Sequence, residues 1–120
     1  MVVSRYLEEQ GDEMNKLKWD RDFALEQAAD DSDLLQELID IFKESSAKDY
    51  RSIEKGVGSK NTEMVCAAAH SIKGAAASLG IEGLREIASD IENDCRQGSL
   101  DTAQNRTVEL EELLRLLRQL

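Results

Sequence analysis

The residues whose types and spacing are best suited to chemistry are His70, Lys73 and Gly74. His70 is the only histidine among the 120 residues. Imidazole is mostly uncharged at neutral pH, so it has a lone pair available to capture a phosphoryl group. On a helix, a lysine three positions later lies close enough to disfavour a second positive charge on the ring and to donate to phosphoryl oxygens. The plain alternatives are a lone surface histidine without chemistry and a solvated lysine.

Helical periodicity places His70 opposite an apolar stripe. At 100° per residue, that stripe gathers Val65, Ala68, Ile72, Ala75, Ala76 and Leu79. His70 points roughly 170° away from its centre on this construction. Most of the neighbours of His70 on the outer face are small, and we expect Cys66, Ala67 and Ala77 to face a partner that approaches the ring.

Gly74 strengthens this interpretation. A glycine inside a helix costs about 1 kcal/mol relative to alanine. The same helix uses alanine at six nearby positions, so alanine would have been the simpler residue at position 74. Because Gly74 lies one turn from His70 on the same face, its missing side chain predicts access for a partner.

The motif His70-x-x-Lys73-Gly74, followed by small residues and Leu79-Gly80, resembles the signature of histidine-containing phosphotransfer (HPt) domains. These domains act in two-component phosphorelays of the kind used in bacterial signalling. The resemblance implies that His70 carries the phosphoryl group on its outer ring nitrogen, with Lys73 assisting. It also implies response-regulator receiver domains and a hybrid histidine kinase as partners. The receiver would bring the Mg²⁺ site, so we expect no cofactor or metal in this chain.

Glu92 and Arg96 form an i, i+4 pair on the following helix, which predicts an ordinary exposed ion pair. Their placement also resembles the HPt pattern, in which a basic residue can lie near the phosphohistidine. We therefore take Arg96 as a partner-facing candidate. Some HPt domains have a glutamine where this chain has Glu92, and a carboxylate there would repel phosphate instead of donating to it.

Two alternative functions stay open from the sequence. One is the phosphoacceptor domain of a chemotaxis-type histidine kinase, excised from a longer protein. The other is a helical interaction module without catalysis, although the intact His70, Lys73 and Gly74 argue against it. The chain is not expected to be a kinase, because no glycine-rich nucleotide loop follows Leu79. A zinc site built on Cys66 and His70 would need distant carboxylates to complete it.

Composition indicates one domain and narrows the range of partners. A net charge of −10 argues against nucleic acid or an anionic membrane surface as partner, and it opposes self-association, so we expect a monomer. No apolar run approaches the roughly 20 residues that a membrane helix requires. The N-terminus has no apolar core of the secretory type. Cys66 and Cys95 are interpreted as unlinked thiols, which favours a reduced cytoplasmic location.

The periodicity predicts an all-α fold, an antiparallel up-down four-helix bundle with one or two short extra N-terminal helices and no sheet. We expect an N-terminal helical extension over 1–18 and the HPt-like bundle over 19–120. Extra helices are predicted at 3–17 and 19–29, and bundle helices at about 32–55, 61–80, 81–98 and 99–120. A flexible link is predicted at 56–60. The first bundle helix should point Leu34, Leu38, Ile41, Phe42 and Ile53 inward.

Overall fold

The computed structural model describes residues 13–120, and all of the regular structure in this range is helical. The elements are a 3-10 turn η1 (Asn15–Leu17) and the helices α2 (Arg21–Gln27), α3 (Ser32–Gly58), α4 (Thr62–Ser78), α5 (Glu82–Arg96) and α6 (Asp101–Leu117). The only strand-like contact in 13–120 is an isolated bridge between Trp19 and Ile81. The all-α prediction is therefore confirmed, whereas the predicted helix at 3–17 lies outside the described residues except for its end.

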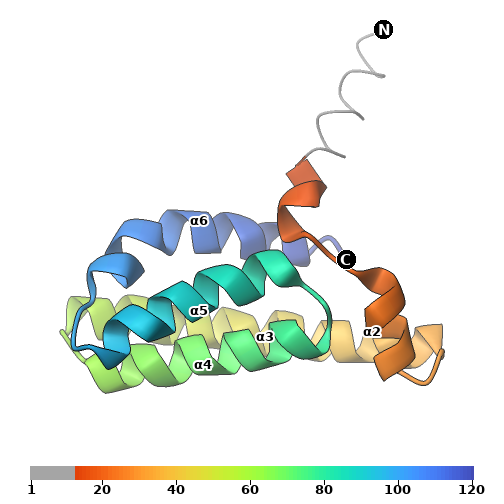
Figure 1. Cartoon of the computed structure of the whole chain (residues 1–120), viewed down its shortest axis with the longest axis horizontal. Coiled ribbons are helices and arrows are strands. Elements are labelled where there is room, and N and C mark those ends of the chain that lie inside the picture. Colours follow the sequence, from red (N-terminus) through yellow and green to blue (C-terminus); the bar gives the residue numbers. More distant parts are fainter. Residues whose placement is uncertain (1–12) are drawn as a thin grey trace, which may run out of the picture.

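Helices α3 to α6 form an up-down bundle, in which α3 packs against α4 and α6, and α5 packs against α4 and α6 (Figure 1). The links between them are short, and short links force successive helices to run antiparallel. At 1.5 Å per residue, α3 is roughly 40 Å long and the other three are roughly 25 Å. One end of α3 therefore extends beyond the bundle, and α2 packs against it (Figure 1).

The core follows the stripe predicted on α4 and continues into α6. In α4, Val65, Ala68, Ile72, Ala76 and Leu79 are buried, and Ala75 is half-buried. In α6 and just after it, Leu120 is half-buried, and the buried residues are Ala103, Leu110, Leu113, Leu114, Leu116 and Leu117. Among residues 13–120, no helix has the length and apolar character that a membrane crossing requires.

The inward face of α3 was predicted partly wrongly. Leu34 and Ile41 are 38% and 62% exposed. Phe42 and Ile53 are buried as predicted, and Leu38 is half-buried. The other buried positions of α3 are Leu35, Ile39, Ser46 and Gly56. Between Leu34 and Phe42 the apolar residues cover a wide arc of the helix surface. The periodicity there does not show which face of α3 is buried. Further along, the small residues Ser46 and Gly56 complete the buried stripe because they allow neighbouring helices to approach closely.

The flexible link predicted at 56–60 is also wrong, because α3 continues to Gly58 and Gly56 is buried. A Cβ atom at position 56 would lie 2.6 Å from Val65 Cγ2 and 3.1 Å from the Asn61 carbonyl oxygen. Gly56 is therefore the place where the end of α3 and the start of α4 come into contact. Only Ser59 to Asn61 link the two helices, and Asn61 caps α4 by accepting from Met64 N.

The segment before the bundle secures the turn between α4 and α5. Leu17 is 1% exposed, and Trp19 Nε1 donates to the Leu79 carbonyl oxygen at 2.9 Å. Asp20 N donates to the Gly80 carbonyl oxygen at 2.9 Å, while the Asp20 side chain caps α2. Gly80 has a φ of +67°, which glycine adopts without strain. The segment thus holds the end of the helix that carries His70.

Gly56 and Gly58 give a matched test of this packing. Gly56→Ala should lower the free energy of unfolding by about 1–3 kcal/mol, because the new methyl group would overlap the stiff, buried Val65 side chain. Gly58→Ala should instead be neutral or raise it by up to about 1 kcal/mol, since a Cβ atom at position 58 would have no neighbouring atom within 4 Å. Equilibrium unfolding in urea measures both. Equal effects of the two substitutions would contradict the close contact.

Candidate functional site

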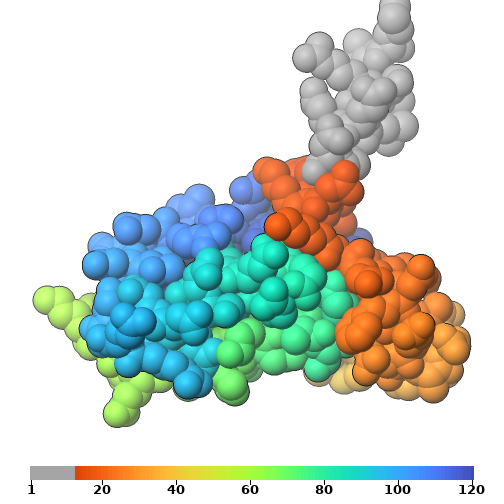
Figure 2. Space-filling model, in the orientation of Figure 1, coloured from red at the N-terminus to blue at the C-terminus, as the bar shows by residue number. Residues whose placement is uncertain are grey.

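Helix α4 presents His70 to solvent, with the side chain 62% exposed. Ala67, Gly74 and Ala77 on the same face are exposed, and a Cβ atom at Gly74 would have no atom within 4 Å. On the face seen in Figure 2, α4 and α5 form one continuous surface. The outward direction predicted for His70 and its small neighbours is therefore confirmed, and we call Ala67, Gly74 and Ala77 the small-residue collar.

Glu92 of α5 lies beneath this surface and joins the basic groups around it. Its side chain is 1% exposed. His70 Nδ1 lies 2.7 Å from Glu92 Oε2, and Arg96 Nη2 donates to the same oxygen at 2.8 Å. Lys73 Nζ donates to Oε1. The prediction of an ordinary exposed pair between Glu92 and Arg96 is wrong, because Glu92 is the buried centre of a four-residue network.

The charge of Glu92 is stabilised by its partners. Burial by itself raises the pKa of a carboxyl group. Hydrogen bonds from Lys73, Arg96 and His70 outweigh that effect and hold the pKa of Glu92 at about 2. Glu92 is therefore a carboxylate at neutral pH, and a buried carboxylate needs such partners because its own desolvation is costly.

The hydrogen bond to Glu92 also fixes which ring nitrogen of His70 is free. A carboxylate can only accept hydrogen bonds, so His70 Nδ1 must carry the proton that it shares with Glu92. In a neutral imidazole the lone pair is then on Nε2. The exposed ring thus offers a nucleophilic nitrogen to solvent while its other nitrogen is anchored.

The structure brings three of the predicted site residues into this network and leaves the others on the surface around it. His70, Lys73 and Arg96 all bond to Glu92. The small-residue collar makes no side-chain bond to it. Cys66 is half-buried, and the interpretation of two unlinked thiols is wrong, because Cys66 and Cys95 form a disulfide with Cα atoms 5.8 Å apart. The two cysteines face one another across α4 and α5, and the distance between their Cα atoms is one that disulfides span.

Glu92 is the functional residue that the sequence interpretation placed wrongly. The buried face of α5 includes Ala88, Ile91 and Cys95. Glu92 lies four residues after the first of these and three before the last, so it belongs to the same stripe. A charged residue in an apolar stripe is rarely buried without a partner. The position of Glu92 within the apolar stripe was therefore the sequence signal for a buried, partnered carboxylate.

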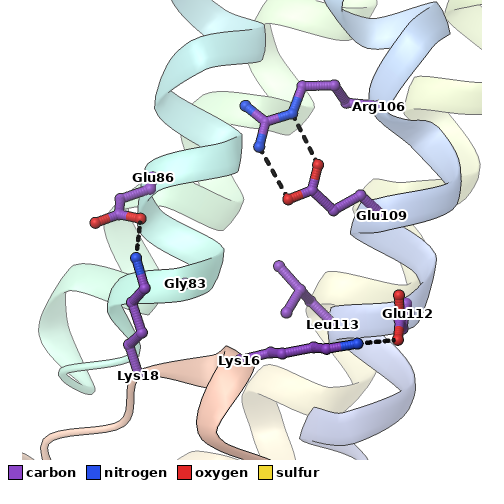
Figure 3. A pocket seen from close by; sticks show the side chains of 8 residues that line it. All are labelled: Lys16, Lys18, Gly83, Glu86, Arg106, Glu109, Glu112 and Leu113. Carbon is purple, nitrogen blue, oxygen red and sulfur yellow. Dashed lines mark hydrogen bonds and ion pairs between the residues drawn. The ribbon is translucent and has the colours of Figure 1, made fainter. Parts of the chain in front are cut away.

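A pocket of about 240 Å³ between η1, α5 and α6 contains another group of cations (Figure 3). Each of its cations is already paired, Lys16 with Glu112, Lys18 with Glu86 and Arg106 with Glu109. The carboxylates lining the pocket cancel the positive charge that would attract an anion. The pocket therefore lacks the excess positive charge that an anion site requires.

A second hollow, of about 410 Å³, lies between α3 and α4 and is mostly apolar. Leu38, Ile41 and Phe42 line it from α3, and Ala75 and Ser78 line it from α4. The α4 residues are one and two turns beyond His70. We call this hollow the α3–α4 groove, and it extends the exposed face of α4 away from Glu92.

Comparison with known proteins identifies the family of the chain. The family model described as Hpt domain matches residues 37–120. The crystal structure of the HPT domain from an Hpt sensor hybrid histidine kinase from Shewanella is similar in fold, with a TM-score of 0.66 at 21% sequence identity. That alignment covers 88% of this chain and 87% of the Shewanella chain. A search of curated proteins found no significant match. The family match spans well over half of the sequence, so the chain belongs to the Hpt domain family, which serves histidine phosphotransfer in phosphorelays.

Proposed function

We propose that His70 Nε2 accepts a phosphoryl group from the aspartate of one receiver domain and passes it to the aspartate of another. The observation that carries this proposal is the bond between His70 Nδ1 and buried Glu92, since it leaves Nε2 as the exposed nucleophile. Hpt domains interact with receiver domains and histidine kinases, which supplies the class of partner.

The bond changes of the transfer step involve the His70 ring, and Glu92 supports the ring. The Nε2 lone pair attacks the phosphorus of the aspartyl phosphate, and the Nε2–P bond forms as the bond from phosphorus to the aspartate oxygen breaks. The aspartate leaves as a carboxylate, and the ring gains positive charge. Glu92 stabilises that charge through Nδ1–H, because the carboxylate is already aimed at the ring before the reaction. Onward transfer is the same step in reverse.

Lys73 and Arg96 are the groups proposed to act on the phosphoryl oxygens. Both side chains are hydrogen-bonded to Glu92, which also holds the His70 ring. The Lys73 side chain is 31% exposed and that of Arg96 is 63% exposed, so both are accessible to a phosphoryl group at the surface. Cations held beside a transferring phosphoryl group stabilise its negative oxygens. Together Lys73 and Arg96 carry two positive charges against the single negative charge of Glu92. This excess offsets the repulsion expected between Glu92 and a phosphoryl group.

The receiver is proposed to dock on the small-residue collar and the adjoining α3–α4 groove. The collar lets a partner approach the ring closely, and the groove adds apolar area with Ile41, which is 62% exposed. Continuity along α4 makes the two one surface. The divalent cation expected with the receiver aspartate, the hybrid kinase as the source of phosphate, the monomeric state and the cytoplasmic location stay predictions.

Replacing the histidine tests the proposal directly. Incubation with a phosphorylated receiver should label the chain with an adduct that is labile in acid and stable in base, and His70→Gln should remove the label. ATP alone should label neither protein, because the chain is proposed to lack kinase activity. The measurement is radiolabel transfer resolved by gel electrophoresis. Persistent labelling of His70→Gln would refute the assignment.

Glu92→Gln should slow transfer about tenfold or more, because the ring loses its negative partner. It should also change how stability depends on pH. The folded pKa of Glu92, about 2, lies below the unfolded value of about 4.3, so the carboxylate stabilises the fold above pH 4.3 and loses this effect as the pH falls towards 2. The difference in unfolding free energy between wild type and variant should therefore shrink over that interval.

Glu37→Gln, which removes an exposed carboxylate from α3, is the matched control for net charge. It should leave the transfer rate unchanged and show no comparable pH dependence. Urea unfolding at several pH values and transfer kinetics at neutral pH measure both variants. Equal behaviour of the two variants would show that Glu92 has no special part in the site.

Gly74 separates docking from folding. Gly74→Ala should raise stability by up to about 1 kcal/mol and keep transfer, because there is open space for a methyl group. Gly74→Gln should keep the helix and the melting temperature yet sharply reduce transfer from a receiver, since the longer side chain covers the approach to His70. Thermal melting and transfer kinetics measure both. A Gly74→Gln variant that transfers at the wild-type rate would contradict docking at this face.

A further inference from the structure

The Cys66–Cys95 disulfide lies beside the residues that hold His70. Cys66 is one turn before His70 on α4, and Cys95 follows Glu92 by three residues on α5. The hydrogen bond from His70 to Glu92 spans the same two helices. The disulfide is therefore a covalent link parallel to the interaction that orients the ring.

Opening this link removes the covalent restraint on the local spacing of α4 and α5. Cys95 is 3% exposed and its Sγ lies 3.3 Å from the Glu92 carbonyl oxygen, so it has little room to move. The freedom gained on reduction therefore falls on Cys66 and on the separation between the helices, one turn from the ring.

The fold does not depend on this disulfide for its core. Val65, Ile72, Ile87 and Ile91 are at most 1% exposed and pack α4 and α5 together. Disulfides are needed for folding mainly in small domains that cannot bury a sufficient core. A chain of 120 residues with a continuous apolar core has no such need. A disulfide that folding does not require, placed beside the site, points to control of the site.

We propose that the Cys66–Cys95 disulfide is a redox control on phosphotransfer, in which the oxidised form holds His70 and Glu92 in register and the reduced form transfers more slowly. This inference rests on the proposed function of His70. Cys66 is the sulfur open to attack, because it is half-buried and borders exposed Ala67, whereas Cys95 is buried.

The reductant is a dithiol. Its thiolate attacks Cys66 Sγ, the Cys66–Cys95 bond breaks, and Cys95 leaves as a thiolate that takes up a proton. The second thiol of the reductant, as a thiolate, then attacks the mixed disulfide, which releases Cys66 as a thiolate that also takes up a proton. Two electrons pass from the dithiol to the cysteine pair, and the reductant leaves as a disulfide. Exchange with an oxidised dithiol reverses the sequence.

The test compares the oxidised protein, the protein reduced with dithiothreitol, and the double variant Cys66→Ser/Cys95→Ser. Transfer from a phosphorylated receiver should be about three- to tenfold slower for the reduced protein. The double variant should match the reduced rate with or without dithiothreitol, which controls for effects of the reductant on the receiver. Nitrogen-15 NMR of the His70 ring should show the Nδ1–H form dominant when oxidised and a more mixed population of the two neutral forms when reduced.

The outcomes separate this inference from the proposed function. Equal transfer rates and equal ring spectra in the two redox states would overturn the redox control and leave the role of His70 intact. A lower melting temperature on reduction with unchanged rate and spectra would likewise overturn it, because the disulfide would then be structural only. Absence of labelling on His70 in every form would overturn the proposed function, and the redox control of transfer with it.

Discussion

The structure depends on the burial of one negative charge. Glu92 is enclosed between α4 and α5, and such a position is stable only if each carboxylate oxygen is occupied by donors. Lys73, Arg96 and His70 satisfy that requirement, and in doing so they are drawn together on the surface. The energetic requirement of a buried group and the chemical requirement of a transfer site are therefore met by the same hydrogen bonds. Both requirements are met only while α4 and α5 keep their register.

The alanine-rich composition of α4 serves both of its faces. On the inner face, Ala68, Ala69 and Ala76 are buried and let the neighbouring helices come close. The outer face is exposed, and its small residues leave His70 standing above its surroundings. A helix built this way contributes less apolar area than one rich in leucine. Leucines and isoleucines of α5 and α6 supply much of the remaining buried core.

The fold could be predicted from the sequence because most of its helices have clear stripes and well-marked ends. Asn61 and Gly80 bound the helix of His70 almost as expected. The prediction failed where local pattern and tertiary packing differ. Leu34 and Ile41 are as apolar as the buried residues of α3, and only the positions of α4 and α6 decide which side is covered. Gly56 lies in a glycine-rich stretch typical of a link between helices, yet it is part of α3, where it packs closely against Val65.

The surface residues of the candidate site could be predicted from the sequence, but the role of the buried Glu92 could not. His70, Lys73 and Gly74 lie within five positions of one another, so a single helix determines their relation. Glu92 is 22 residues from His70, and its role depends on how α5 packs against α4. The disulfide has the same origin, since 29 residues separate its cysteines. Periodicity along one helix carries no direct information about the neighbour across an interface.

The anchoring of His70 through Nδ1 has a consequence for the direction of signalling. Because the anchored nitrogen is not the one that reacts, the ring need not turn over between receiving and donating the phosphoryl group. Forward and backward transfer then pass through the same arrangement, as microscopic reversibility requires. The chain itself favours neither direction. In the proposed relay, the relative phosphorylation potentials of the two receivers set the net flow of phosphate, so removing the signal at one end would let the same histidine drain phosphate from the other.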